Sequence, residues 1–108
     1  MKILVSAVLA FLPTIVLASG STGYQTVLSL QQRACSGDRG FQITLSAAHQ
    51  NPDGCSNNRV LDIACDSPAF NQMVAMTLTA YSAGHQLEAW VSGCDSEGQA
   101  KVTALTIK

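Results

Sequence analysis

Apolar and polar residues alternate along most of the chain, and this period of two predicts β-strands. The expected strands are five, and they span residues 24–32, 41–46, 59–65, 86–92 and 101–107. In the second of them Phe41, Ile43 and Leu45 alternate with polar residues, which predicts one buried and one hydrated face. Segments rich in glycine, asparagine and aspartate separate the strands, and their composition predicts turns.

One stretch between the third and fourth expected strands has the period of an α-helix instead. Its apolar residues form one stripe at helical spacing, which consists of Phe70, Met73, Val74, Leu78 and Tyr81. The strands and the helix together predict a core that consists of Leu28, Leu30, Phe41, Ile43, Leu45, Phe70, Met73, Val74, Leu78, Leu87, Val91 and Leu105. Ser67 and Pro68 suit the N-cap and the first helical position, and Gly84 suits the left-handed residue after the helix end. Small or apolar residues on the other side could form a subunit contact or serve simply as good helix formers: Ala69, Met76, Ala80 and Ala83.

The order of elements is therefore strand, strand, strand, helix, strand, strand, in a mainly β protein with one helix. Five strands with a helix between the third and the fourth are typical of the OB-fold, a small, partly open barrel. The competing architecture is an open antiparallel sheet with a helix on one face. The two differ in whether the first strand pairs with the fourth, and we predict the five-stranded OB-like barrel.

Four cysteines, an even number in a small chain, predict two disulfide bonds. Cys55 and Cys65 lie at the two ends of one extended strand, about 30 Å apart and far beyond disulfide reach. Cys35 and Cys55 lie at opposite ends of the second strand, which disfavours that pair as well. If the fourth strand runs antiparallel to the first, Cys94 meets Cys55, and the pairs are Cys35–Cys65 and Cys55–Cys94.

The chain begins with the layout of a secretory signal peptide. Lys2 supplies a positive start, residues 3–17 are apolar, and Ala18 ends a small-residue cleavage motif. The apolar run is too short to cross a membrane, and no second run follows it. We therefore expect residues 1–18 to be removed and residues 19–108 to form one disulfide-stapled domain that is secreted or periplasmic.

Charge and metal-ligand patterns argue against several kinds of partner. Without Lys2 the chain has five basic and seven acidic residues, a formal net charge of −2, and no basic cluster for nucleic acid. The cysteines form no C-x-x-C pair and the histidines are isolated, so we expect no metal ion or other cofactor. His85 follows the expected helix end, where a cation is favourable, and His49 lies in a polar loop, where we expect it to be solvated.

The sequence offers little that predicts catalysis. No G-x-S-x-G elbow is present, and Pro68 lacks the backbone donor that an oxyanion hole next to Ser67 would need. Asp62 and Asp66 flank the end of the third strand, and with a histidine they would form the site of a small secreted hydrolase. We expect no enzyme, because Asp66 has the simpler role of favouring the helix start.

Trp90 is the only tryptophan, and together with Glu88 it is our candidate for ligand binding. Leu87, Ala89 and Val91 share one face of the fourth strand, so Glu88 and Trp90 share the other, more polar face. An exposed aromatic ring beside an acid can stack on a sugar or anchor a partner protein. The alternative is that Trp90 lies under a loop or fills the barrel, with Ala89 facing outward.

Two segments carry a resemblance to a known family. The first is Phe70-Asn71-Gln72-Met73 in the expected helix, and the second is Tyr81-Ser82-Ala83-Gly84 with the strand that follows it. A helix that ends in aromatic-x-x-Gly and leads at once into an apolar strand resembles the pentamer-forming B subunits of subtilase-cytotoxin and pertussis-like toxins. It also resembles small exported bacterial proteins of the same pattern. The resemblance implies an OB-fold that binds cell-surface glycans, and it assigns no glycan contact to a position here.

These patterns lead to one expected function and two alternatives. We expect an exported, non-catalytic binding module for a glycan or a protein surface. A toxin B-like subunit, and with it a homo-oligomer, is one form that such a module could take. The alternatives are a small secreted hydrolase and an enzyme inhibitor.

Overall fold

The computed structural model describes residues 20–108 as five strands and one helix in the predicted order. The predicted signal peptide, residues 1–18, and its cleavage position lie outside the described residues. The elements are β1 (Gly20–Ser36), β2 (Arg39–Leu45), β3 (Asn57–Ile63), α1 (Phe70–Ala83), β4 (Gln86–Cys94) and β5 (Gln99–Ile107). β1 is about twice as long as the sequence pattern predicts, since it extends beyond residues 24–32 at both ends.

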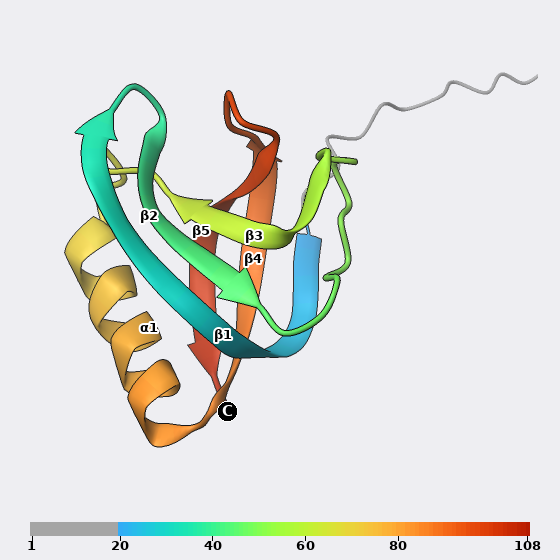
Figure 1. The fold of residues 1–108 in the computed structure, drawn as a ribbon, viewed down its shortest axis with the longest axis vertical. Coiled ribbons are helices and arrows are strands. Elements are labelled where there is room, and N and C mark those ends of the chain that lie inside the picture. The colour runs from blue at the N-terminus through green and yellow to red at the C-terminus, as the bar shows by residue number, and fades with distance from the viewer. Residues whose placement is uncertain (1–19) are drawn as a thin grey trace, which may run out of the picture.

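The strands close into a barrel in the order β1-β2-β3-β5-β4, and β4 pairs back with β1 (Figure 1). β3 and β5 run parallel, whereas every other neighbouring pair is antiparallel. Closure pairs the strand edges that an open sheet would leave exposed. The pairing of β1 with β4 therefore confirms the five-stranded OB-like barrel and excludes the open sheet.

β1 reaches two neighbours because it bends across the barrel. Its first half pairs with β4 and its second half with β2, and Figure 1 shows the strand curving between them. Register shifts at Ser21–Tyr24 and Val27–Ser29 mark the irregular points, and Gly23 supplies a positive φ of 76° at the first. The second shift places Val27 in the core and leaves Leu28 55% exposed, so the prediction that Leu28 is buried is wrong.

The core fills the barrel with apolar side chains from all five strands and the helix. It includes six residues that the pattern predicts: Phe41, Ile43, Leu45, Met73, Leu87 and Val91. Four further predicted residues pack against the core while partly exposed: Leu30, Phe70, Val74 and Leu105. Small residues that the pattern does not distinguish complete it, among them Ala80, Ala89 and Ala100.

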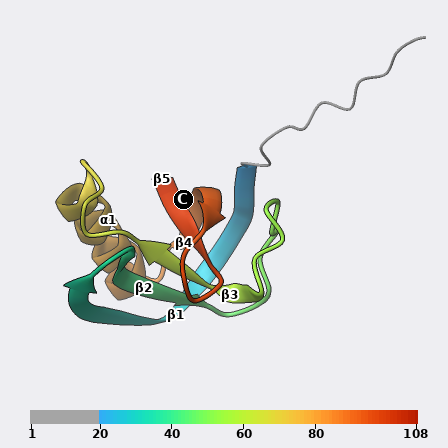
Figure 2. The same ribbon diagram turned by 90° about the horizontal axis from the view of Figure 1, so that it is seen from above.

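α1 lies on one side of the barrel, opposite the loop between β2 and β3 (Figures 1 and 2). It begins at Phe70, its N-cap residue is Ala69, and no side chain forms a capping hydrogen bond. The prediction that Ser67 and Pro68 begin the helix is therefore wrong. The Phe70 N–H donates to the Ser67 carbonyl at 3.0 Å, which makes this stretch a turn. Gly84 ends the helix with a φ of 71°, as predicted. Within residues 20–108, no helix is long and apolar enough to cross a membrane.

The helix presents a different side to the barrel from the one that its apolar stripe predicts. Met73, Thr77 and Ala80 are buried, whereas Leu78 and Tyr81 are each 49% exposed. Thr77 is tolerated inside because its hydroxyl donates to the Met73 carbonyl at 2.8 Å. Burial of Ala80 also rules out the predicted subunit contact through this residue, and the exposed apolar side of the helix is the one with Leu78 and Tyr81.

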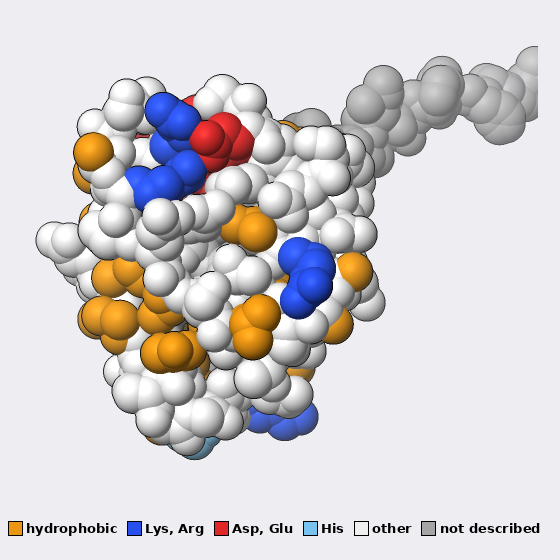
Figure 3. All heavy atoms as spheres, in the orientation of Figure 1, with side chains coloured by type: hydrophobic (Ala, Val, Ile, Leu, Met, Phe, Trp, Pro, Cys, Tyr) orange, Lys and Arg blue, Asp and Glu red, His pale blue; other side chains and the backbone are white. Residues whose placement is uncertain are grey.

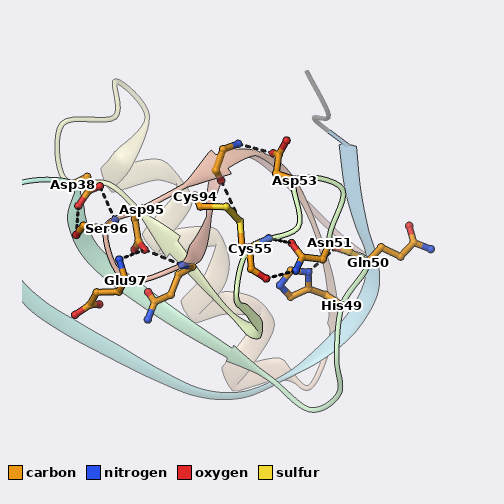
Figure 4. Close-up of a disulfide and its surroundings, with 12 residues drawn as sticks. Asp38, His49, Gln50, Asn51, Asp53, Cys55, Cys94, Asp95, Ser96 and Glu97 are labelled. Carbon is orange, nitrogen blue, oxygen red and sulfur yellow. Dashed lines mark hydrogen bonds between the residues drawn. A yellow bond between two sulfur atoms is a disulfide. The ribbon is translucent and has the colours of Figure 1, made fainter. Parts of the chain in front are cut away.

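Two disulfide bonds tie the loops to the barrel, and they have the predicted connectivity. Cys35 at the end of β1 is bonded to Cys65, and the two Cα atoms lie 5.7 Å apart. Cys55 in the loop before β3 is bonded to Cys94 at the end of β4, with a Cα–Cα distance of 5.6 Å (Figure 4). The antiparallel pairing of β1 with β4, on which the prediction depended, is also present.

Two leucines give a direct test of the bend in β1. Leu45→Ala should lower the free energy of unfolding by about 3–5 kcal/mol, because Leu45 is fully buried and its loss leaves a cavity. Leu28→Ala should lower it by less than about 1 kcal/mol, because this side chain faces solvent. Urea denaturation of both variants measures the difference. Equal losses would contradict the register shift at Val27–Ser29.

Candidate functional site

Trp90 faces outward from the barrel. Along β4, Leu87, Ala89 and Val91 are buried, and the residues between them point to the outside. Trp90 is 44% exposed, and the fully buried Ala89 takes the inward position. Trp90 therefore points outward, and its indole ring is accessible to a ligand.

The neighbours of Trp90 on both adjacent strands are small. Ser21 of β1 lies directly across from it on one side, and Ala104 of β5 lies across from it on the other. Directly opposite residues are the closest side-chain neighbours in an antiparallel pair. Because neither residue is large, a substantial part of the indole stays exposed as an aromatic platform on the sheet, and Trp90 is 44% exposed. The Thr103 hydroxyl, which donates to the Trp90 carbonyl at 3.2 Å, adds a further support for the strand at this point.

Glu88 and Tyr24 lie beside this platform. Glu88 is two residues before Trp90 on β4, and Tyr24 of β1 lies directly across from it. The Ser21 hydroxyl donates a hydrogen bond to the Glu88 carboxylate, and the ammonium of Lys108 lies 4.9 Å from the centre of the Tyr24 ring. We call this surface the Trp90 face, and its residues are Ser21, Tyr24, Glu88, Trp90, Ala104 and Thr106.

A second group of polar residues lies at the end of the barrel where the β1–β2 and β4–β5 turns meet. Asp38 of the first turn accepts hydrogen bonds from the backbone N–H and the hydroxyl of Ser96 in the second, at 2.9 and 3.0 Å (Figure 4). Glu97 lies between Arg33 and Arg39 and pairs with both, and these cations hold the pKa of Glu97 below its usual value. We call these five residues the turn clamp, and Figure 3 shows charged side chains of both signs gathered there.

The turn clamp changes where a ligand could bind. In OB-folds the face of β2 and β3, between these same two turns, commonly holds the ligand. Here the hydrogen bonds of Asp38 with Ser96 join the two turns directly, and Glu97 ties the second turn to Arg33 in β1 and to Arg39 at the start of β2. The sequence could not have predicted the clamp, because its members are about 58–64 residues apart along the chain. The Trp90 face, on β1, β4 and β5, carries no such contact between turns among the described residues, and Trp90 and Tyr24 are partly exposed on it.

Two buried aspartates lie behind the turn clamp. Asp62 has no exposed surface, Asp95 is 6% exposed, and the two carboxyl groups lie within hydrogen-bonding reach. One Asp62 oxygen accepts the Gly40 N–H at 3.0 Å and lies 3.7 Å from Arg33. The other oxygen of Asp62 and one of Asp95 accept no hydrogen bond within the described part of the chain. If Asp62 is protonated and donates a hydrogen bond to Asp95, each of these two oxygen atoms gains a partner.

This geometry makes Asp62 a proton-binding group at mildly acidic pH. Burial, followed by the nearby Asp95 carboxylate, raises the pKa of Asp62 to about 6, whereas the Gly40 hydrogen bond and Arg33 act in the opposite direction. Asp95 itself holds the β4–β5 turn, because one of its oxygens accepts the N–H groups of Glu97 and Gln99 at 2.8 Å each. The aspartate pair therefore has a structural role in the described chain.

The structure separates the residues of the alternative hydrolase site. Asp62 is inaccessible to a substrate, whereas Asp66 is exposed in the turn before α1 and lies outside the first helical turn. His49 is 5% exposed and its Nδ1 lies 2.6 Å from the Gln50 carbonyl oxygen, so the prediction that it is solvated is wrong. Across residues 20–108, no three His, Cys, Asp or Glu side chains are placed to hold a metal ion, and no pocket is present.

The buried aspartate predicts an unusual dependence of stability on pH. The folded protein binds the Asp62 proton more tightly than the unfolded chain, whose pKa is about 3.8, so stability rises as the pH falls through 6. We expect the free energy of unfolding to be about 1 kcal/mol greater at pH 5 than at pH 7. Below about pH 4.5, protonation of Glu97 should reverse the trend, because its pKa is lowered in the fold.

Two substitutions test whether Asp62 causes the rise in stability between pH 7 and pH 5. Asp62→Asn keeps an oxygen for the Gly40 N–H but carries no charge, so its stability should not increase between pH 7 and pH 5. Asp66→Asn, at an exposed position, should keep the increase of the unsubstituted protein. Urea denaturation at the two pH values measures both, and an unchanged slope in Asp62→Asn would show that another group binds the proton.

The chain matches no protein-family model, no curated protein and no solved structure in the three comparisons made. The resemblance to toxin B subunits therefore remains a prediction. The features that bear on function are those of the described residues themselves, above all the partly exposed aromatic platform of the Trp90 face.

Proposed function

We propose that the protein is an exported, non-catalytic binding module that takes a glycan or a protein surface on the Trp90 face. The observation that carries this proposal is the exposed indole of Trp90 between Ser21 and Ala104. Tryptophan is among the residues that contribute most to binding when a partner covers it. A large aromatic ring left in solvent with small neighbours suits a surface that becomes buried in a complex.

The cysteine content supports an exported location. All four cysteines form disulfide bonds, and such bonds persist in the oxidising environment outside the cytosol. The predicted signal peptide agrees with this location. On this basis the protein works as a secreted or periplasmic module, where glycans and the surfaces of other exported proteins are the available partners.

The burial of Asp62 favours binding over hydrolysis. A hydrolase of two carboxylates needs both of them at the substrate, and Asp62 has no exposed surface. Asp66, the exposed acid nearest to Asp62 in sequence, lies in a turn and is not paired with Asp62 in the sheet. Turnover of a glycoside by the purified protein, lost in Asp62→Asn with stability unchanged, would establish the hydrolase instead.

Self-association, as in a toxin B-like subunit, has its own support in α1. The helix carries no charged residue, and Leu78 and Tyr81 are each about half exposed on it. Figure 3 shows apolar side chains gathered over the region that α1 occupies in Figure 1. An exposed apolar face without charges can be buried against another copy without desolvating an ionised group, so it is suited to such a contact.

The binding proposal predicts the effect of removing the indole. Trp90→Ala should abolish or strongly weaken capture of the protein by a glycan array or by a partner protein, because the platform is lost. The circular dichroism spectrum and thermal midpoint should change little, because the ring lies outside the core. Leu28→Ala removes an exposed apolar side chain from another part of β1 and should bind normally. Unchanged binding by Trp90→Ala would exclude the Trp90 face.

The self-association proposal predicts a change in molecular mass. Size-exclusion chromatography with light scattering should give more than one chain per particle, and Leu78→Gln should shift the protein toward the monomer. Thr79→Gln, at the next exposed position around the helix, is the matched control and should leave the mass unchanged. A monomeric unsubstituted protein would remove the support for a toxin B-like assembly while leaving the binding proposal open to its own test.

A further inference from the structure

The Trp90 face combines an apolar platform with hydrogen-bonding groups at its edge. The indole is partly exposed, and the Glu88 carboxylate and the Ser21 hydroxyl lie on the same outer surface of β1 and β4. Thr106 of β5 adds a second exposed hydroxyl across from Glu88. The surface therefore offers an aromatic plane with polar acceptors on one side of it.

This combination matches the two-sided chemistry of a sugar ring. A pyranose has a face of C–H groups, which can pack on an aromatic plane, and a rim of hydroxyl groups, which need hydrogen-bond partners. A carboxylate accepts hydrogen bonds only, and each of its oxygens has more than one acceptor position. Although Ser21 already donates to one Glu88 oxygen, the carboxylate can accept further hydrogen bonds from ligand hydroxyls.

The charge on the surface separates two classes of glycan. Glu88 is the only acid among the residues of the Trp90 face. The ammonium of Lys108 lies over the ring of Tyr24, and within residues 20–108 no ion pair joins it to Glu88. An anionic sugar on Trp90 would therefore bring its carboxylate or sulfate toward Glu88, and like charges brought together disfavour binding.

We propose that the Trp90 face binds a neutral pyranose, stacked on the indole with a hydroxyl donating to Glu88, and discriminates against anionic sugars. This inference rests on the proposed binding function and names the class of its ligand. Lactose and 3′-sialyllactose form a suitable pair of probes, since the second differs from the first by one anionic sugar. Methyl glycosides of glucose, mannose and N-acetylglucosamine extend the neutral set.

The single tryptophan makes the test direct, because fluorescence excited selectively in tryptophan reports on Trp90 alone. At least one neutral sugar should shift the emission across the millimolar range, and lactose should bind about tenfold more tightly than 3′-sialyllactose. The inference is overturned if 3′-sialyllactose binds as tightly as lactose, or if no neutral sugar alters the emission.

Glu88→Gln tests whether the charge of Glu88 causes the preference for neutral sugars or whether Glu88 only supports the strand. The variant should bind lactose about fivefold more weakly, because a neutral amide is a weaker acceptor. It should bind 3′-sialyllactose no more weakly than before, so the preference should shrink toward unity. Asp66→Asn, which removes an exposed charge elsewhere, should keep the full preference. An unchanged preference in Glu88→Gln would contradict the assignment of Glu88.

These outcomes also distinguish this inference from the proposed function. Binding of an anionic glycan or a protein that is lost in Trp90→Ala would overturn the neutral-sugar inference and retain the Trp90 face. Calorimetry measures binding in that variant, which has no tryptophan to report. Glycan binding that persists in Trp90→Ala would overturn both.

Discussion

The pairing of one bent strand with two neighbours is the constraint on which this structure depends. β1 closes the barrel because its first half pairs with β4 while its second half pairs with β2. The Trp90 face and the turn clamp both depend on that path. The first half brings Ser21 and Tyr24 beside Trp90, and the second half carries Arg33 and Cys35 to the end where the turns meet. A straight strand could not have supplied both places.

The strand path also explains which parts of the fold the sequence predicts. Element order follows from alternation and from lengths along the chain, which are local properties. Barrel closure and the disulfide pairs follow in turn from that order, because five strands with a helix between the third and the fourth are typical of the OB-fold. The exposure of Leu28 could not be predicted in this way, because a single bulge exchanges the two faces of a strand and leaves no mark in an alternating sequence. The side of α1 that faces the barrel could not be predicted either. The smaller Thr77 and Ala80 are buried there, and the larger Leu78 and Tyr81 are half exposed.

The candidate site shows the same division. The outward direction of Trp90 and Glu88 could be predicted from the alternation of β4 alone. Their small neighbours could not be predicted, because Ser21 and Ala104 reach Trp90 only through the pairing register of two other strands. The burial of Asp62 could not be predicted for a related reason, since an alternating strand gives no sign that Arg33 and Asp95 of the β4–β5 turn lie against its side chain. A buried acid of this kind is retained at a cost in stability near neutral pH.

The two disulfide bonds overlap along the chain, since Cys55 lies between Cys35 and Cys65, and Cys65 lies between Cys55 and Cys94. Any single cut of the backbone between Cys35 and Cys94 therefore leaves both pieces joined by at least one covalent bridge. The loop before β3 and the β4–β5 turn both lie within this span, and exposed loops are where proteases first nick a chain. A nicked molecule would still hold β1, which forms one side of the Trp90 face, together with the strands that follow, as one covalent unit.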